Sequence, residues 1–299
     1  MSTAPSAASP VSKALPPQLA KAMSRLTEIS SLPEITTRVV AVVEDPRATA
    51  ADMHDIVKND PALATKILKV VNSAFYGLPS QIASLDRAII MLGLSAVKNV
   101  ALAASLAQLF RGEPITEQFT PQDLWRHCIS VGVCARRLAQ KSGVAQADEY
   151  FVSGLVHDMG LLVVAQLFPE RLREVTERCY ETPQDFCAAE REILGADHQM
   201  FGAALAEKWR FPPVLRNAAS YHHDPENLKP EFRKLTTCVF VADTICARLQ
   251  HGYYLTSQVQ EVTADQLALI GFNPAGMGEL CEELPELIEE AEAILIEHG

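Results

Sequence analysis

The sequence has no excess of basic residues, and this absence limits what the protein can bind. Its 299 residues include 26 Lys and Arg against 37 Asp and Glu, which gives a formal net charge of -11 at pH 7. Proteins that hold nucleic acid without regard to its sequence need many Lys and Arg side chains on phosphates. Basic runs, and basic residues interleaved with aromatic ones, are also missing. We therefore expect no nucleic-acid contact through a large basic face.

The sequence also lacks paired cysteines and uninterrupted apolar runs. Its seven cysteines form no CxxC pair and fall mostly at positions typical of helix cores. Such cysteines behave as small buried hydrophobic residues in a reducing compartment, so we predict a cytoplasmic protein. Residues 1–11 contain no apolar core of the kind that a signal peptide needs. Polar residues interrupt the apolar stretches before they reach membrane-spanning length, so we expect no membrane association.

The chain does contain a succession of helix signals. Asp60-Pro61 and Thr120-Pro121 each join an N-cap residue to a first-turn proline. Ser84 and Gly93 bracket the segment from Leu85 to Leu92 as cap and stop. No segment alternates convincingly between apolar and polar residues with period two, the pattern of a half-buried strand. The sequence therefore predicts an all-α, multi-helix fold, and its 48% of apolar residues suffice for a core.

The segment Arg111-Gly112-Glu113-Pro114-Ile115-Thr116 is the best candidate for a boundary within this helical chain. We interpret residues 1–14 as a disordered tail and residues 15–112 as an N-terminal helical lobe. Residues 113–299 would form a second helical lobe. This lobe ends in an acidic amphipathic helix from Glu279 to Glu297.

The most informative feature is a set of histidines and carboxylates in the second lobe. Val156-His157-Asp158-Met159-Gly160 places a histidine beside an aspartate in an apolar helical stretch that runs from Tyr150 to Leu167. Burying this pair without partners is costly, so a metal ion or a hydrogen-bond network must satisfy it. Further candidates lie in or beside predicted helices: Asp123, His127, His198, His222, His223 and Asp243.

These residues can be divided between two metal positions. His127, His157, Asp158 and Asp243 would supply two imidazoles and two carboxylates, a donor set that suits Fe, Mn, Zn or Ni. A second position would be formed by His198, His222 and His223, with Asp158 bridging. Bridging makes Asp158 the catalytic candidate as well. The sequence thus predicts one or two divalent ions and leaves the element open.

Each candidate also has an ordinary structural explanation when it is taken alone. Asp123 can stabilise the first turn of its helix, and His222 and His223 can end theirs. A buried histidine usually bonds a backbone carbonyl, and His198 can do so as a first-turn residue. Only the presence of all these residues together, and their order in the chain, favours a shared site.

At these residues the chain resembles the HDOD family, the HD-related output domain of bacterial signalling proteins, over roughly residues 17–285. Its second lobe is similar to the HD superfamily of metal-dependent phosphohydrolases. The matching runs of the first lobe are Asp60–Leu63, Lys66–Leu68, Val71–Gly77, Ile82–Leu85 and Ala88–Gly93. Those of the second are Leu124–His127, Gly154–Gly160, His198–Leu205, Trp209–Pro213, Tyr221–His223 and Val241–Asp243.

The resemblance implies an N-terminal helical lobe packed on an HD-like lobe, a role in signal output, and a sensor or receiver partner acting in trans. HD-GYP enzymes, which are related phosphodiesterases of cyclic di-GMP, hold metal at positions that match the predicted set. Asp123 stands where those enzymes have Glu. Leu161 replaces their Lys after the HD-x-G run, and their GYP loop is missing. Loss of that lysine removes a charge that would stabilise the phosphoryl transition state, so metal binding is expected more than catalysis.

Three functions remain open from the sequence. The first is a signalling module with a metal-binding HD-like site that acts through a partner or a ligand such as a nucleotide. The second is a metal-dependent phosphohydrolase acting on a nucleotide or a cyclic dinucleotide. The third is a helical scaffold whose His and Asp residues satisfy one another. We place the first ahead. We interpret Arg136, Arg137 and Lys141 as a solvated helix face rather than a phosphate clamp, and an oligomer is compatible with all three functions.

Overall fold

The computed structural model describes residues 14–24, 33–58, 60–73, 76 and 78–296. Within these ranges every regular element is a helix, and the one β-type feature is an isolated bridge between Thr116 and Phe119. The all-α prediction is therefore confirmed. The predicted tail, apart from Ala14, lies outside the described residues, as do Ala74, Phe75 and Gly77 of one family-like run.

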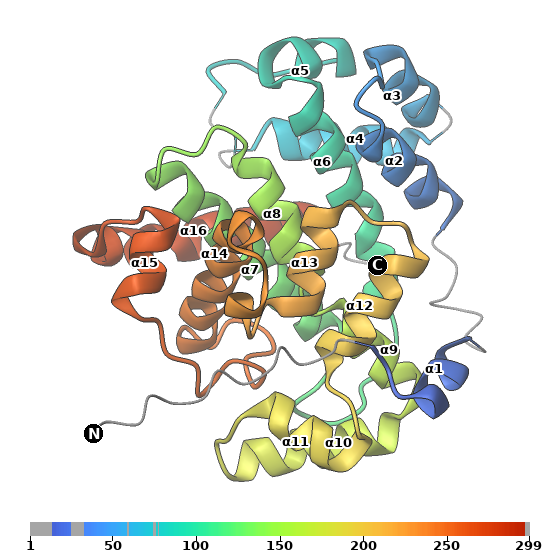
Figure 1. Cartoon of the computed structure of the whole chain (residues 1–299). Helices are drawn as coiled ribbons and strands as arrows, with labels where there is room; N and C mark the ends of the chain where they lie inside the picture. Colours follow the sequence, from blue (N-terminus) through green and yellow to red (C-terminus); the bar gives the residue numbers. More distant parts are fainter. Residues whose placement is uncertain (1–13, 25–32, 59, 74–75, 77, 297–299) are drawn as a thin grey trace.

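The first part of the chain folds into short helices that begin at the predicted signals. The helices are α1 (Pro17–Ser24), α2 (Glu34–Glu44), α3 (Ala50–Val57), α4 (Pro61–Val71), α5 (Leu85–Leu92), α6 (Leu94–Leu106) and the 3-10 turn Ala107–Phe110. The Asp60 carboxylate accepts from the backbone N–H of Leu63, and the Ser84 hydroxyl accepts from that of Arg87. Helices α2 to α6 gather at one end of the molecule, whereas α1 lies against α9 (Figure 1).

The second part contains the longer helices and the central core. The helices are α7 (Pro121–Lys141), α8 (Ala147–Val156), α9 (Met159–Leu167), α10 (Pro169–Glu181), α11 (Phe186–Leu194), α12 (His198–Lys208), α13 (Pro213–Tyr221), α14 (Pro230–Arg248), α15 (Ala264–Ile270) and α16 (Met277–Leu295). Residues Thr236 to Ala247 of α14 are all buried, which makes α14 a central helix of this part. Helix α7 packs against α8, α14 and α16 and forms the axis of this part (Figure 1).

Two predicted helices are wrong in their bounds. For the stretch from Tyr150 to Leu167 the sequence predicts one helix through His157 and another from Leu161 to Phe168. In the structure α8 ends at Val156, α9 begins at Met159, and Asp158 takes the N-cap position between them. Thr182-Pro183 has the same cap-plus-proline pattern as Asp60-Pro61 and so predicts a helix from Gln184 to Leu194, but the helix begins at Phe186. The Asp185 carboxylate caps it by accepting from the backbone N–H of Ala188, while Thr182 is extended, as a residue before proline prefers.

The break between α8 and α9 also bears on the expectation about membranes. Residues Ala147–Leu167 together have the length and apolar composition of a membrane-spanning helix, contrary to the expectation that polar residues interrupt every such stretch. In the fold, 83% of the most apolar window of this segment is buried inside the protein. Its apolar composition therefore matches its place in the core.

A polar contact as well as helix packing joins the first part of the chain to the second. Helix α6 packs on α8, and α4 packs on α16. The Tyr76 hydroxyl donates to Asp148 at 2.9 Å, and Arg136 donates to the same oxygen at 3.0 Å while its guanidinium covers the Tyr76 ring. The Arg136 side chain is only 9% exposed, so its assignment to a solvated face is wrong. Arg137 and Lys141 pair with Glu283 of α16.

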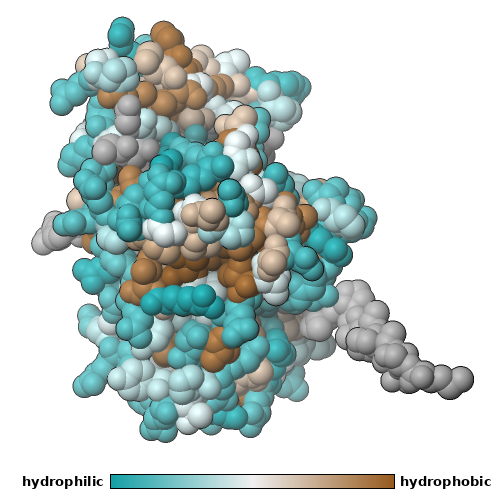
Figure 2. Space-filling view, turned by 90° about the vertical axis from the view of Figure 1, so that its left-hand side faces the viewer, coloured by the Kyte–Doolittle hydropathy of each residue, from teal (hydrophilic) through white to brown (hydrophobic). Residues whose placement is uncertain are grey.

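Helix α5 exposes apolar side chains at the far end of the first part. Ile90 is 80% exposed and Met91 is 44% exposed. Figure 2 shows apolar residues at the end of the molecule where α5 lies. No element in the described ranges covers this face of α5.

Candidate metal centre

The predicted site residues reach one place from several helices. His127 lies on α7 and Asp243 on α14, while His157 and Asp158 occupy the break between α8 and α9. His198 is the first residue of α12, and His222 and His223 directly follow α13. The short side chains of His and Asp can meet because helix ends and a helix break (His157, Asp158, His198, His222 and His223) face the interior positions His127 of α7 and Asp243 of α14.

Close packing between α9 and α12 fixes the position of His198. A Cβ atom at Gly160 would overlap the carbonyl oxygen of His198, and it would also lie 2.7 Å from the backbone nitrogen of Gly202. Glycine at position 160 therefore lets the start of α9, with Asp158 before it, approach the start of α12. The Gly160 of the HD-x-G run has a packing role at the site.

Asp158 lies at the middle of the histidines. Its Oδ1 is 3.2 Å from the Nε2 atoms of both His198 and His222. Its Oδ2 is 3.4 Å from the Nε2 of His157 and 3.8 Å from that of His127. All five side chains are fully buried. Four imidazoles from different helices thus direct the same ring nitrogen toward one carboxylate.

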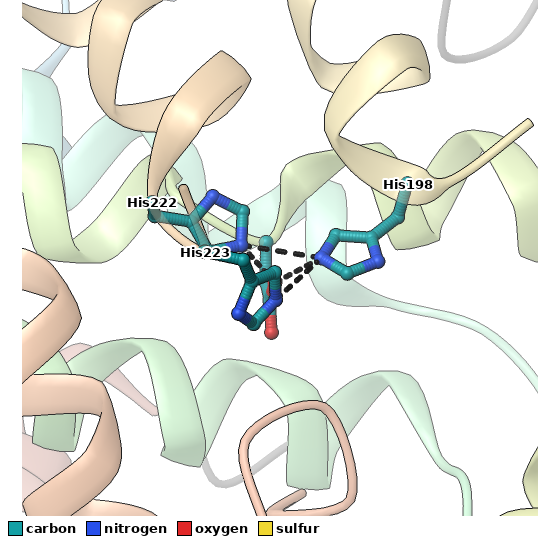
Figure 3. A group of neighbouring side chains, drawn as sticks. His198, His222 and His223 are labelled. Atoms are coloured by element: carbon teal, nitrogen blue, oxygen red, sulfur yellow. Dashed lines mark hydrogen bonds and ion pairs between the residues drawn. The ribbon is translucent and has the colours of Figure 1, made fainter. Parts of the chain in front are cut away.

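Three of the rings also face one another. The Nε2 of His198 is 3.2 Å from that of His222 and 3.1 Å from that of His223. Figure 3 shows these rings converging from two helices, with the dashed contacts meeting at their inner nitrogens. The inner nitrogens therefore surround a common point next to Asp158.

The outer nitrogens of these rings are held by oxygen acceptors. The Nδ1 of His157 donates to the carbonyl of Gly154 at 2.6 Å, and that of His222 donates to the carbonyl of Ala218 at 3.0 Å. The Nδ1 of His223 donates to the Gln260 side-chain oxygen at 2.5 Å. Because a carbonyl only accepts, each Nδ1 carries a hydrogen, and Nε2 of the neutral ring presents a lone pair to the centre.

This arrangement fits a divalent cation. Lone pairs 3.1–3.2 Å apart repel unless a positive charge lies between them, and one proton on His198 can bridge only one of its contacts. Buried atoms without a hydrogen-bond partner also face the centre: His127 Nε2, His157 Nε2, Asp158 Oδ1 and Asp243 Oδ1. A metal ion held by imidazole nitrogen and carboxylate oxygen would satisfy all of these atoms together.

The residues form two overlapping groups that share Asp158. One group contains Asp158, His198, His222 and His223, and the other contains His127, His157 and Asp158. Within each group, one ligand atom from every residue lies within 4.8 Å of the others. Asp243 Oδ1 is 3.1 Å from His127 Nε2, at the border of the second group. This grouping follows the predicted division, and the occupancy of either position stays a prediction.

Asp123 also belongs to neither group, and its carboxylate, unlike that of Asp243, bonds residues at the start of its own helix. Its carboxylate accepts from the Thr120 hydroxyl at 2.7 Å and lies 3.4 Å from a guanidinium nitrogen of Arg126. The Thr120 hydroxyl in turn accepts from the backbone N–H of Asp123 at 2.9 Å. These bonds stabilise the first turn of α7, which is the structural alternative that the sequence left open.

Residues of the loop 249–263 support the centre, and the sequence analysis missed them. Thr256 donates to Asp158 Oδ2 at 3.4 Å, and Ser257 donates to Asp243 Oδ2. The Gln260 amide donates to Asp243 Oδ2 at 3.4 Å while its oxygen holds His223. Gly252 (φ +72°) lies so close to the backbone of α7 at His127 that a Cβ atom would overlap it. Ser, Thr and Gln in a loop give no signal until the fold places them.

Burial and neighbouring histidines shift the pKa values of the two buried aspartates in opposite directions. Burial alone raises the pKa of Asp158, but His157, His198 and His222 outweigh it and hold this pKa well below its usual range. His127 has the same effect on Asp243, whose pKa is also lowered despite burial. Burial, together with the charge of His223, holds the pKa of His222 well below its usual value. Charged carboxylates beside a neutral His222 are the ionisation states that bind a cation.

Fold and site together define an all-helical protein with a buried His/Asp centre. The HDOD domain family model matches residues 29–225, which is more than half of the chain. The chain therefore belongs to the HDOD family, and the predicted resemblance is confirmed. Asp243 and the loop 249–263 lie beyond the matched residues.

Solved structures share this fold. An HDOD domain protein with unknown function from Geobacter sulfurreducens is 22% identical, with a TM-score of 0.78 over 93% of this chain and 97% of that one. A proposed phosphohydrolase from Shewanella amazonensis SB2B is 23% identical, with a TM-score of 0.71 over 93% and 98%. A proposed signal transduction protein from Marinobacter aquaeolei VT8 is 22% identical, with a TM-score of 0.69 over 93% and 63%.

A sequence relative is longer than the part that this chain matches. An uncharacterized protein from Treponema pallidum (strain Nichols) is 27% identical over 221 residues, which cover 73% of this chain and 42% of that protein. The match therefore spans less than half of the length of this relative.

Proposed function

We propose that this chain is a signal-output protein whose buried His/Asp centre holds one or two divalent metal ions, and that it acts through a partner or ligand rather than by catalysis. The observation that carries the proposal is the convergence of four imidazole Nε2 atoms on Asp158. Family membership and the proposed signal transduction role of the Marinobacter protein support the signalling part. The partner would be a sensor or receiver protein acting in trans.

The chain's own residues determine what the centre would do. Asp158 would bridge the two groups, His198, His222 and His223 would hold one ion, and His127, His157 and Asp243 would hold the other. A bound divalent ion would supply Lewis acidity toward an oxygen ligand such as a phosphate. Thr256, Ser257 and Gln260 keep the two carboxylates oriented. The surrounding core keeps bulk water away from them.

Features around the centre oppose catalysis. Leu161, at the position of the HD-GYP lysine, is fully buried and brings no charge to a phosphate. Arg136, Arg137 and Lys141 are engaged in ion pairs with Asp148 or Glu283, so none of them acts as a phosphate clamp. Asp158, His157, His198 and His222 have no exposed surface, so only the partly exposed His223 can contact a solute without a rearrangement.

A second candidate function is a metal-dependent phosphohydrolase acting on a nucleotide or a cyclic dinucleotide. The two overlapping ligand groups favour it, because neighbouring metal positions that share a carboxylate suit phosphoryl chemistry. The Shewanella protein, described as a proposed phosphohydrolase, has the same fold. The possible nucleotide ligand of the first proposal would then be a substrate.

Hydrolysis assays on metal-loaded protein separate the two functions. Protein stripped with a chelator is reconstituted with Mn, Fe, Zn or Ni and incubated with bis(4-nitrophenyl) phosphate and with cyclic di-GMP. We expect the metal to bind and raise the melting temperature without turnover. Turnover that disappears in Asp158→Asn would contradict the proposal in favour of the hydrolase. A matched Asp123→Asn variant should bind metal like the wild type.

A further inference from the structure

Glu190 has an unusual environment next to the candidate centre. It lies on α11, is fully buried, and belongs to none of the runs that match the HD superfamily. Its Oε2 accepts from the Nδ1 of His198 at 2.6 Å and from the backbone N–H of His198 at 2.9 Å. One carboxylate oxygen therefore holds both the ring of His198 and the first residue of α12.

The negative charge of Glu190 is not required for these two bonds. A glutamine oxygen would accept the same two hydrogens without the cost of burying a charge. The second carboxylate oxygen, Oε1, is buried and has no hydrogen-bond partner. A buried negative charge needs a partner that can carry positive charge, and the His198 ring, 2.6 Å away, is placed to be that partner.

His198 is the one ring of the centre whose outer nitrogen bonds a carboxylate. The outer nitrogens of His157 and His222 bond backbone carbonyls, and that of His223 bonds an amide oxygen. A carboxylate makes imidazole a stronger donor than a neutral carbonyl does, because it stabilises the positive charge that the ring acquires on coordination. The Nδ1 of His127 has no hydrogen-bond partner, so His198 is distinguished from the other four rings by its charged partner.

We propose that Glu190 is a positioning residue of the metal centre: it accepts the Nδ1 hydrogen of His198 and turns the Nε2 lone pair of this ring toward Asp158, His222 and His223. The proposal rests on the proposed metal site. It also predicts different metal affinities for the two positions, because Glu190 acts on the group that contains His198 and not on the group of His127 and His157. The position of His198 would then bind its ion more tightly.

Cys187 provides a competing arrangement that the test must separate. Cys187, Glu190 and His198 also place ligand atoms within 4.8 Å of one another. If a metal ion lay among these three residues, Glu190 would be a ligand itself rather than a positioning residue. Replacement of Cys187 by serine distinguishes the two arrangements, because only the competing one needs the thiol.

The test compares Glu190→Gln with Cys187→Ser and with Glu192→Gln, an exposed residue of the same helix that pairs with Arg178. Affinity for Zn²⁺ and Mn²⁺ is measured by chelator competition on full-length protein, and the stability of the metal-free form by urea unfolding. We expect Glu190→Gln to weaken the tighter site by about 10- to 100-fold. The metal-free Glu190→Gln protein should stay folded, and both control variants should bind like the wild type.

Any one of four results would overturn the proposal. Wild-type affinity in Glu190→Gln would remove Glu190 from the centre while leaving the metal site intact. An equal loss in Cys187→Ser would make Glu190 a ligand. No metal binding by the wild-type protein would refute the proposed function and this inference together. In metal-free protein, ¹⁵N NMR of the histidine rings should show His198 protonated at Nδ1, and a ring protonated only at Nε2 would contradict the positioning role independently.

Discussion

At the scale of single residues, the two aspartates 123 and 243 show how similar sequence contexts lead to different roles. Both aspartates belong to the predicted set of site residues, together with His127. Asp243 approaches the Nε2 of His127 at 3.1 Å, whereas Asp123 bonds Thr120 at the helix start. The sequence alone does not show which aspartate faces the centre and which one stabilises a helix start, because both lie in predicted helices among apolar neighbours.

The two alanine replacements should therefore affect different properties, metal binding in one case and stability in the other. Asp243→Ala should abolish binding at one metal position, because it removes a buried carboxylate that faces the centre. Asp123→Ala should leave metal affinity unchanged and cost about 1 kcal/mol of stability through the lost helix-start bonds. Metal titration and urea unfolding measure the two quantities. A larger loss of affinity in Asp123→Ala than in Asp243→Ala would refute the assignment.

Leu161 gives a second test at this scale. Because Leu161 is fully buried in α9, Leu161→Lys places a charge in the core. We expect no hydrolysis of cyclic di-GMP and a loss of about 3 kcal/mol or more in unfolding free energy. Leu161→Met, which conserves volume, is the control and should cost less than about 1.5 kcal/mol. Hydrolysis by a stably folded Leu161→Lys protein would show that lysine is the missing catalytic part.

At the scale of helices, the packing of α9 on α12 sets the geometry of the centre. Gly160→Ala would force these helices apart because its Cβ overlaps the His198 carbonyl. We expect a loss of about 1–3 kcal/mol in stability, as for other overpacked sites, and weaker metal binding. Gly278→Ala is the matched control, since nothing lies within 4 Å of its Cβ position in α16. Wild-type metal affinity in a folded Gly160→Ala protein would contradict this role.

The contact between α7 and α16 predicts a pH dependence. Arg137 donates to Glu283 through two nitrogens, at 2.9 and 2.7 Å, and this bond lowers the pKa of the Glu283 carboxyl. The pair therefore stabilises the fold above the pKa of unfolded Glu, and this contribution is lost as the pH falls through the lowered folded pKa. Arg137→Met should cost up to about 1 kcal/mol at pH 7. An equal cost at pH 3, measured by urea unfolding, would refute the ion pair.

The helices themselves were largely predictable because their ends carry local signals. Asp60, Ser84 and Asp197 each accept from a backbone N–H of the first turn, as their sequence positions indicated. The break after His157 was also predicted, but the start of the next helix was placed at Leu161 instead of Met159. The Asp158 side chain makes no capping bond there, so the usual signal of a helix start is missing.

At the scale of the whole molecule, the site residues were predictable as a set, but their surroundings were not. The order of His and Asp in the chain pointed to a common site, and the fold brings His127, His157, Asp158, His198, His222, His223 and Asp243 together. The sequence did not predict the roles of Glu190, Ser257 and Gln260, because these roles depend on contacts with residues 8 to 37 positions away. Such contacts exist only once the helices are packed.

The central claim is that Asp158 and the surrounding histidines hold metal, and metal content per chain tests it most directly. Wild-type protein and Asp158→Asn are purified without chelators or metal-affinity resin and reconstituted in parallel, and each is measured by elemental analysis. The account predicts one or two equivalents of Fe, Mn, Zn or Ni in the wild type and a clear loss in Asp158→Asn. Metal-free wild-type protein after reconstitution, or equal metal content in both proteins, would contradict it.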